Sequence, residues 1–199
     1  MTKAFIRIID INKTLISHLK DEFKHSTVNI IEGDIFDYNA DAIVSPANSF
    51  GYMDGGLDGK LKTFFGLPIE TKVRQKINAD HNGELLVGQT AVVETDNEAF
   101  PFLIVAPTMR VPSDVSESIN AYLAMRAVLF TAIENKMIST IIIPGLCSLS
   151  GRMAPHTVAR QMRAAYDYAI LGSYRFSHWR FEKEFEAYLK SKLDQTPIE

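Results

Sequence analysis

The chain has 199 residues, and its 46% hydrophobic and 23% charged content is that of a globular domain with a substantial core. A net charge of -3 argues against nucleic acid as the main partner, and no stretch has the length of a membrane-spanning helix. The single cysteine excludes an internal disulfide, and the start lacks a signal-peptide apolar region, so a cytoplasmic location is expected.

Runs of β-branched and apolar residues predict strands, and apolar residues at helical spacing predict helices between them. In chain order we expect a strand at 4–9, a helix at 14–23, strands at 28–31 and 42–45, helices from 57 and at 69–79, strands at 87–94 and 102–106, a helix at 116–136, a strand at 140–143 and a helix from 155 to about 170. Repeated strand-loop-helix units indicate an α/β sheet covered on both faces.

After Gly172 the chain carries aromatic residues among charged ones at roughly helical spacing. They are Phe176, Trp179, Phe181, Phe185, Tyr188 and Leu189. The pattern predicts an amphipathic C-terminal helix that packs on the body, with a dimer contact as the alternative. We therefore expect a main domain at 1–172 and a C-terminal helix and tail at 173–199, with the last residues, 194–199, frayed.

A polar, glycine-rich stretch at 45–59 directly follows the apolar run 42–44. Glycine allows positive φ and close backbone approach, so the strand is expected to stop and let its loop bend over a ligand. Asn48 can donate and accept hydrogen bonds through its amide, and Asp58 can hold or deprotonate a water. A helix that starts near Leu57 would turn its free N–H groups toward the same ligand.

Three predicted loops are expected to meet at one edge of the sheet. Asn48, Thr108 and Ser148 each come directly after a strand run, and ligands of such sheets gather beyond the carboxyl ends of the strands. The loop 147–153 also precedes a helix that starts at Pro155. Its backbone N–H groups and the helix dipole could hold a diphosphate.

Three ordered motifs resemble the macro domain family, which binds ADP-ribose. The spacing from Asn48 to Gly55-Gly56-Leu57-Asp58 is similar to the signature of its ADP-ribosyl-hydrolase branch, and Gly33-Asp34-Ile35 followed by 41–44 resembles the preceding strand and turn. The segment 143–153 is similar to the strand and phosphate loop. The resemblance covers about residues 28–169 and implies a three-layer α/β/α fold with a mixed sheet.

The resemblance also implies roles for individual residues. Asp34 would accept a hydrogen bond from the adenine amino group, Asn48 would orient the distal ribose, and Asp58 would hold or activate the attacking water. The residues implied to bind the ligand, with Thr108 added from its position after a strand, are Asp34, Ile35, Ser45, Asn48, Gly55, Gly56, Leu57, Thr108, Cys147, Ser148, Leu149, Ser150, Gly151, Arg152 and Met153.

Hydrolysis at the distal ribose is the activity that the resemblance implies, without a cofactor or metal. The substrate would be a mono-ADP-ribosylated protein side chain, an acylated ADP-ribose or ADP-ribose phosphate. The alternative is a reader or sensor that binds ADP-ribose or a related NAD-derived nucleotide without turnover. Asp58 at the hydrolase spacing favours the enzyme. A Rossmann-like enzyme is a weaker alternative because Gly-x-Gly-x-x-Gly is absent.

Several candidate residues have a structural alternative. Asp34 could cap a turn, and Arg152 could be a solvated loop residue. Cys147, near a helix N-terminus, could be a nucleophile, although a structural role is favoured. His156 is expected on an exposed helix face, and no histidine shows metal-ligand spacing.

The sequence departs from the family pattern at several positions. The family's loop usually begins with Asn, where this chain has Ser45. It also usually has a longer glycine run, where this chain has Asp54. Cys147 and Leu149 stand where glycine, serine or threonine is typical. Leucine at a position of close approach would narrow the pocket or change the path of the backbone.

Overall fold

The computed structural model describes residues 4–191, so the predicted tail at 194–199 lies outside the described residues. Its elements are β1 (Phe5–Asp10), α1 (Lys13–Glu22), β2 (Asn29–Glu32), the 3-10 turn η1 (Ile35–Asp37), β3 (Ala42–Ser45), α2 (Gly56–Phe65), α3 (Pro68–His81), β4 (Ala91–Glu94), β5 (Phe102–Val105), α4 (Asn120–Glu134), β6 (Thr140–Ile143), α5 (Pro155–Tyr166), the π turn η2 (Asp167–Leu171) and α6 (Trp179–Lys190).

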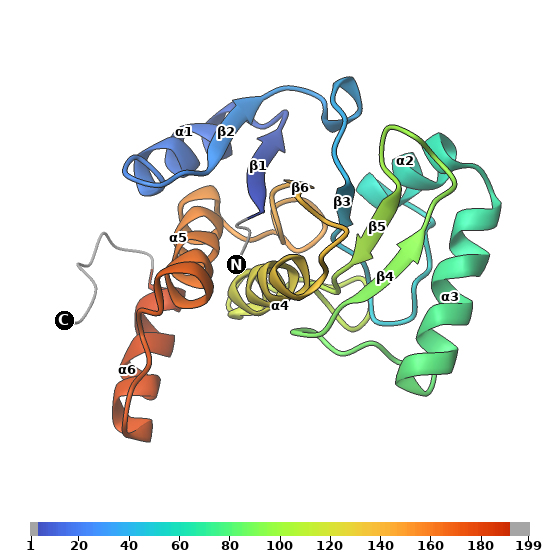
Figure 1. Ribbon diagram of the computed structural model, residues 1–199. Helices are drawn as coiled ribbons and strands as arrows, with labels where there is room; N and C mark the ends of the chain where they lie inside the picture. Colours follow the sequence, from blue (N-terminus) through green and yellow to red (C-terminus); the bar gives the residue numbers. More distant parts are fainter. Residues whose placement is uncertain (1–3, 192–199) are drawn as a thin grey trace.

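The strands form one sheet in the order β2-β1-β6-β3-β5-β4. All neighbours are parallel except β4 and β5, which pair antiparallel. Helices α1, α4 and α5 cover one face, and α2 and α3 cover the other (Figure 1). The predicted three-layer α/β/α fold with a mixed sheet is therefore confirmed.

Two cores lie on the two faces of the sheet because successive side chains of a strand point to opposite sides. Val44 and Ile143 pack in the core beneath α1, α4 and α5, whereas Ile43 and Ile142 pack in the core beneath α2 and α3. All four are fully buried. Continuous apolar runs in β3 and β6 thus reflect central strands that are covered on both faces.

Two elements begin later than predicted. The strand expected at 87–94 begins at Ala91, because Leu86 to Gln89 form a turn in which Gly88 has φ 92° and the Gln89 amide donates to the Leu86 carbonyl. The helix expected at 116–136 spans only Asn120–Glu134. In both cases a turn precedes the element and delays its start; before α4 the Ser118 amide donates to the Val115 carbonyl at 3.0 Å.

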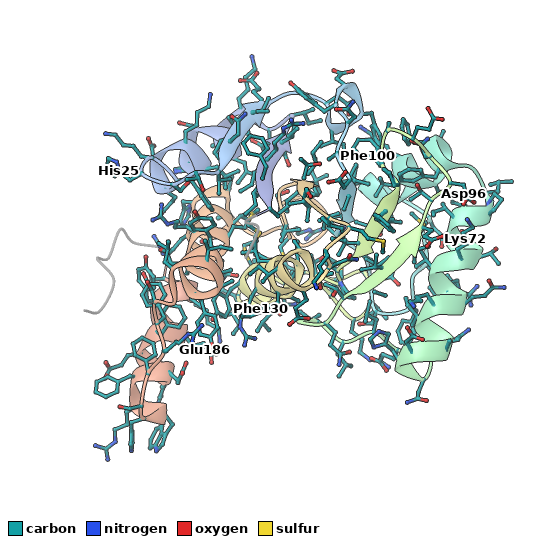
Figure 2. All side chains as sticks on the ribbon, in the orientation of Figure 1. His25, Lys72, Asp96, Phe100, Phe130 and Glu186 are labelled. Carbon is teal, nitrogen blue, oxygen red and sulfur yellow. The ribbon has the colours of Figure 1, made fainter. Side chains whose placement is uncertain are left out.

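Helix α3 is attached to the edge strand β4 by Lys72. Its ammonium pairs with the Asp96 carboxylate, beside it in Figure 2, and donates to the Glu94 carbonyl over 3.2 Å. Helix α2 in turn contacts α3 and β3. The second helical layer is thus connected to the sheet through both of its helices, α3 to β4 and α2 to β3. Asp58 lies at the start of α2 in this layer.

The C-terminal helix α6 extends from the body beside α5 (Figure 1). It buries Phe185 and Leu189 in the larger core and leaves Trp179 and Phe181 exposed. The buried Gln161 of α5 holds it in place. No helix within residues 4–191 is long and apolar enough to cross a membrane.

Gln161 joins three helices through one side-chain amide. Its Nε2 donates to the Ser118 carbonyl at 2.8 Å and the Leu189 carbonyl at 3.1 Å, and its Oε1 accepts from the Tyr122 amide at 3.2 Å. We predict that Gln161→Met lowers the free energy of unfolding by about 3 kcal/mol, because each buried group left without a partner costs about 1 kcal/mol or more. Urea denaturation measures the change.

Gln75→Met is the matched control, because Gln75 is an exposed residue of α3. We expect it to change the free energy of unfolding by less than about 0.5 kcal/mol. Equal losses in the two variants would show that the Gln161 bonds contribute nothing specific.

Candidate active site

The predicted loops meet at the carboxyl edge of the sheet. The loop after β3 runs beside the segment after β5, where Asn48 forms a parallel bridge with Met109 and the Ser49 amide donates to the Arg110 carbonyl at 3.1 Å. A Cβ placed on Gly56 would lie 3.7 Å from Ser150 Oγ, so the glycine loop and the loop 147–153 are close neighbours. Three separate segments therefore build one site.

Asp58 lies in the first turn of α2 and is only 8% exposed. Ser45, at the end of β3, donates its hydroxyl to Asp58 Oδ1 at 2.5 Å. Burial raises the pKa of the Asp58 carboxyl from its ordinary 3.8 to about 6, and the bond from Ser45 limits the rise. A carboxyl with this pKa is ionised at neutral pH and can accept a proton from water.

Asn48 directs its amide into its own loop. Its Nδ2 donates to the Tyr52 carbonyl at 2.7 Å, and its Oδ1 accepts from the Phe50 and Tyr52 amides at 3.1 and 3.3 Å. Both acceptor positions of Oδ1 are thus used within the loop. Asn48 therefore shapes the loop 48–52 and retains one N–H of Nδ2 for other partners.

The loop 147–153 has a tightly folded backbone. Met153 N donates to the Cys147 carbonyl at 3.1 Å, and a Cβ on Gly151 would lie only 2.7 Å from the same oxygen. The loop leads into α5, whose cap residue Ala154 offers no side-chain bond to the first helical amides. Leu149 is 67% exposed and Arg152 is exposed, so neither side chain fills the inside of the loop.

Cys147 is buried beneath the site with φ 63°. Burial raises the pKa of its thiol to about 12, and its Sγ lies 4.0 Å from the Thr108 carbonyl. A thiol with this pKa has almost no thiolate at neutral pH. The geometry supports the structural role over the nucleophile.

Two further predicted residues take part in the local structure. Asp34 caps η1, where its Oδ1 accepts from the Phe36 amide at 3.1 Å, and none of the described residues donates to its Oδ2. Thr108 is 1% exposed and donates its hydroxyl to the Pro46 carbonyl at 3.3 Å. Thr108 thus joins two loops from within and does not line an open crevice.

His156 differs from the prediction of an exposed helix face. It is partly buried at the start of α5, and its ring centroid lies 6.0 Å from that of His18 on α1. The reason is that α1 packs closely on α5. Within residues 4–191 no group of three or more potential metal ligands is present.

Sequence reasoning missed Asp10, which connects the site loops at the end of β1. Its carbonyl accepts from the Gly33 amide at 3.1 Å, and its Oδ2 accepts from the Gly145 amide at 3.1 Å. Its Oδ1 accepts from the Asn12 amide at 2.8 Å. An acid at a strand end, two residues before a helix cap, is the sequence signal for part of this role.

Sequence reasoning also missed a support of the glycine loop. Glu70 of α3 accepts from the Met53 amide at 3.4 Å and pairs with Lys62 of α2, which lies 3.9 Å from the Asp54 carboxylate. The Lys62 ammonium holds the pKa of Glu70 below its ordinary value. The pair holds the last turn of α2 against α3, and Glu70 also holds the loop that precedes α2.

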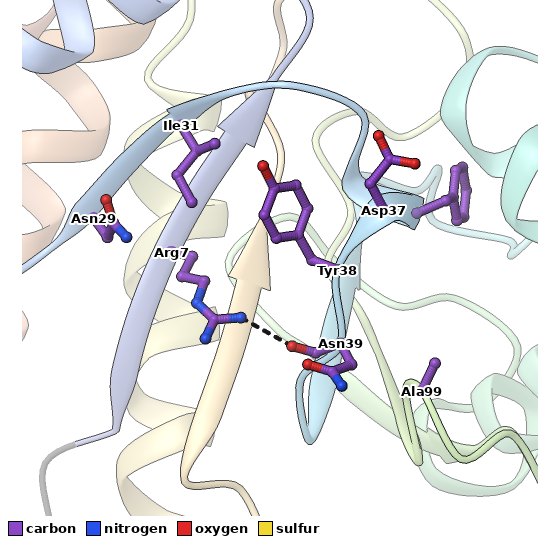
Figure 3. Close-up of a pocket in the computed structure, with 8 residues that line it drawn as sticks. Arg7, Asn29, Ile31, Asp37, Tyr38, Asn39 and Ala99 are labelled. Carbon is purple, nitrogen blue, oxygen red and sulfur yellow. Dashed lines mark hydrogen bonds between the residues drawn. The ribbon is translucent and has the colours of Figure 1, made fainter.

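A hollow of about 620 Å³ lies away from this edge, on the sheet face beside β1 and β2 (Figure 3). Its lining includes Arg7, which donates to the Asn39 carbonyl at 3.0 Å, and Tyr38. None of the predicted site residues lines it. The hollow thus shares no residue with the predicted site, and it adjoins the site at η1, whose Phe36 and Asp37 line it.

The fold and the site define a three-layer α/β/α protein with a loop-built site at the carboxyl edge of its sheet. The family model of the Macro domain matches residues 44–162. An Aquifex aeolicus relative, an uncharacterized protein, is 30% identical over 135 residues, which are 68% of this chain and 78% of the relative. The chain belongs to the macro domain family.

Solved structures agree with the fold. The macrodomain of Mycobacterium tuberculosis DarG matches with a TM-score of 0.59 at 20% identity, over 68% of this chain and 86% of that chain. The Oceanobacillus iheyensis macrodomain with ADP has a TM-score of 0.59 at 20% identity, over 67% of this chain and 70% of that chain. A mutant of the latter was solved with ADPR.

The raised pKa of Asp58 makes stability depend on pH. The folded protein holds this proton up to about pH 6, whereas the unfolded chain releases it near 3.8, so stability falls as pH rises through this window. The loss is on the order of 3 kcal/mol. We predict that Asp58→Asn, whose amide oxygen can still accept from Ser45, unfolds at a higher temperature than wild type at pH 7.5.

Asp54→Asn is the control, because the Asp54 side chain is 76% exposed in the same segment. Its effect on the free energy of unfolding should stay within about 0.5 kcal/mol. The measured quantity is the difference in free energy of unfolding between wild type and Asp58→Asn. If this difference stays constant between pH 4 and pH 7, the prediction is contradicted.

Proposed function

We propose that this macro-domain protein binds ADP-ribose and hydrolyses an ADP-ribose derivative at the distal ribose. The substrate is a mono-ADP-ribosylated protein side chain, an acylated ADP-ribose or ADP-ribose phosphate. The observation that carries the proposal is the Asp58 carboxyl, which is buried beside the glycine loop with one oxygen held by Ser45. The solved Oceanobacillus iheyensis macrodomain structures, one with ADP and one mutant with ADPR, support ADP-ribose as the ligand class.

In this proposal each loop contacts a different part of the ligand. The amides of the loop 147–153 and the free N–H groups at the start of α5 hold the diphosphate, as helix N-termini do for anions. Gly55 and Gly56, which carry no side chain, let the backbone approach the distal ribose. Asp34, with its Oδ2 not engaged by the described residues, accepts from the adenine amine.

Asp58 performs the proton transfer in this proposal. Its ionised carboxylate accepts a proton from a water, and the water oxygen bonds to the anomeric carbon or to the linked ester carbon. When the water attacks the anomeric carbon, the bond from this carbon to the carried group breaks, and the carried group leaves with the electron pair. When the water attacks the carbon or phosphorus of a linked ester, the bond from that atom to the ribose oxygen breaks, and the ribose oxygen leaves with the pair. In both cases the leaving atom takes up the proton that Asp58 accepted from the water. A pKa of about 6 suits a general base that works near neutral pH.

A reader without turnover is the second candidate, and Asn48 favours it. Its amide Oδ1 is fully used within the loop 48–52, which leaves a single N–H for orienting a ribose. In such a reader the same loops bind ADP-ribose, and Asp58 serves only to accept a hydrogen bond from it.

Calorimetric titration with ADP-ribose tests the binding. We expect a dissociation constant in the micromolar range, equivalent to about -8 kcal/mol. AMP, the control ligand, should bind at least about tenfold more weakly because it lacks the second phosphate and the distal ribose. Absence of heat with ADP-ribose, supported by an unchanged melting temperature, would contradict the proposed ligand.

A hydrolysis assay with Asp58→Asn separates the enzyme from the reader. Loss of a general base lowers turnover by about 100-fold or more. Binding of ADP-ribose should change by no more than about fivefold, because the substitution keeps the size and one acceptor oxygen. Wild-type turnover should rise with pH through about 6 as Asp58 ionises. Equal turnover in wild type and variant would exclude Asp58 as the base.

A further inference from the structure

The bond between Ser45 and Asp58 joins the central sheet to the candidate base. Ser45 is the last residue of β3 and is 2% exposed. Its backbone is held by pairing with Val105, and its carbonyl accepts from the Ala106 amide at 2.9 Å. Its hydroxyl therefore has a fixed position relative to the sheet.

Asp58 has no comparable support from other groups. Within residues 4–191 the only hydrogen bond to its carboxylate comes from Ser45, at 2.5 Å to Oδ1. The other oxygen, Oδ2, is not among the fully enclosed polar atoms that lack a partner. The terminal torsion of an aspartate is soft, so a single bond at Oδ1 decides where Oδ2 lies.

We propose that Ser45 is the positioning residue of the active site: its hydroxyl holds Oδ1 of Asp58, so that Oδ2 is the oxygen available to the attacking water. Ser45 thus acts through Asp58, in place of the direct ligand contact that the resemblance implies. Its role in turnover rests on the proposed function, whereas its hold on the carboxylate does not.

Ser45 is also the group that lowers the pKa of Asp58 against the effect of burial. Burial raises the pKa of the carboxyl, the Ser45 bond lowers it, and no charged side chain contributes. The charged neighbours on the same segment are Asp54, Lys60 and Lys62. Asp54 and Lys60 are exposed, and Lys62 pairs with Glu70 of α3. Removal of the hydroxyl therefore leaves burial unopposed.

The test is titration of the Asp58 side-chain carboxyl carbon by NMR in wild type, Ser45→Ala and Ser45→Thr. In Ser45→Ala we expect the pKa of Asp58 to rise by about one pH unit, the size expected for loss of a hydrogen bond to a carboxylate. Ser45→Thr keeps a hydroxyl and should restore most of the wild-type value. If Ser45→Ala fails to fold, Ser45→Cys keeps the volume and substitutes a weaker donor.

Ser49→Ala is the matched control. Ser49 is 1% exposed and lies in the same loop, and none of the described hydrogen bonds joins it to Asp58. It should leave the pKa of Asp58 unchanged. An equal pKa in Ser45→Ala and Ser49→Ala overturns the proposal.

Turnover provides the second readout. In Ser45→Ala, kcat should fall about tenfold or more above the new pKa, with KM nearly unchanged, and the acid limb of the pH profile should move with the NMR value. An unchanged kcat overturns the positioning role. A wild-type protein without turnover overturns the proposed hydrolysis alone, because the titration tests the hold of Ser45 on Asp58 by itself.

Discussion

The structure depends on the parallel pairing of β3 with both β5 and β6. In this arrangement the carboxyl ends of three strands lie at one edge, and the segments that follow them must leave the sheet together. The pairing continues beyond the strands, since the Thr108 amide donates to the Ala47 carbonyl at 2.9 Å and Asn48 bridges to Met109. The floor of the site is thus an extension of the sheet and not a free loop.

The buried carboxyl of Asp58 at this edge lowers the stability of the fold. Asp58 is 8% exposed, and only one described hydrogen bond reaches its carboxylate. A residue whose pKa is shifted mainly by burial, in a site built by several loops, is a candidate for chemistry. The hydrophobic core beneath α2 and α3 offsets this cost, and the pair of Lys62 with Glu70 holds the last turn of α2 against α3.

The departures from the family pattern have a common structural outcome. Cys147 places its side chain in the core with a positive φ, and Gly151 lies where any Cβ would meet the Cys147 carbonyl. Leu149 points its side chain outward and is 67% exposed. Neither of these substituted side chains therefore projects into the inside of the loop 147–153.

Local features were predictable from the sequence because they depend on neighbouring residues. Apolar runs predicted the strands, proline and glycine predicted loops and helix starts, and the spacing from Asn48 to Asp58 predicted the family. The boundary of β4 was wrong because the turn at Gly88 depends on side-chain bonds, such as that from the Leu86 amide to Gln89 Oε1 at 3.1 Å.

Tertiary structure alone decided how the site residues meet. Asp10 and Gly145 are 135 positions apart, and only the pairing of β1 with β6 brings them within hydrogen-bond distance. Likewise, the end of β3 and the first turn of α2 must pack together before Ser45 can reach Asp58. Such contacts depend on strand register and helix packing, which one sequence does not determine locally, so the support of the candidate base became visible only in the folded chain.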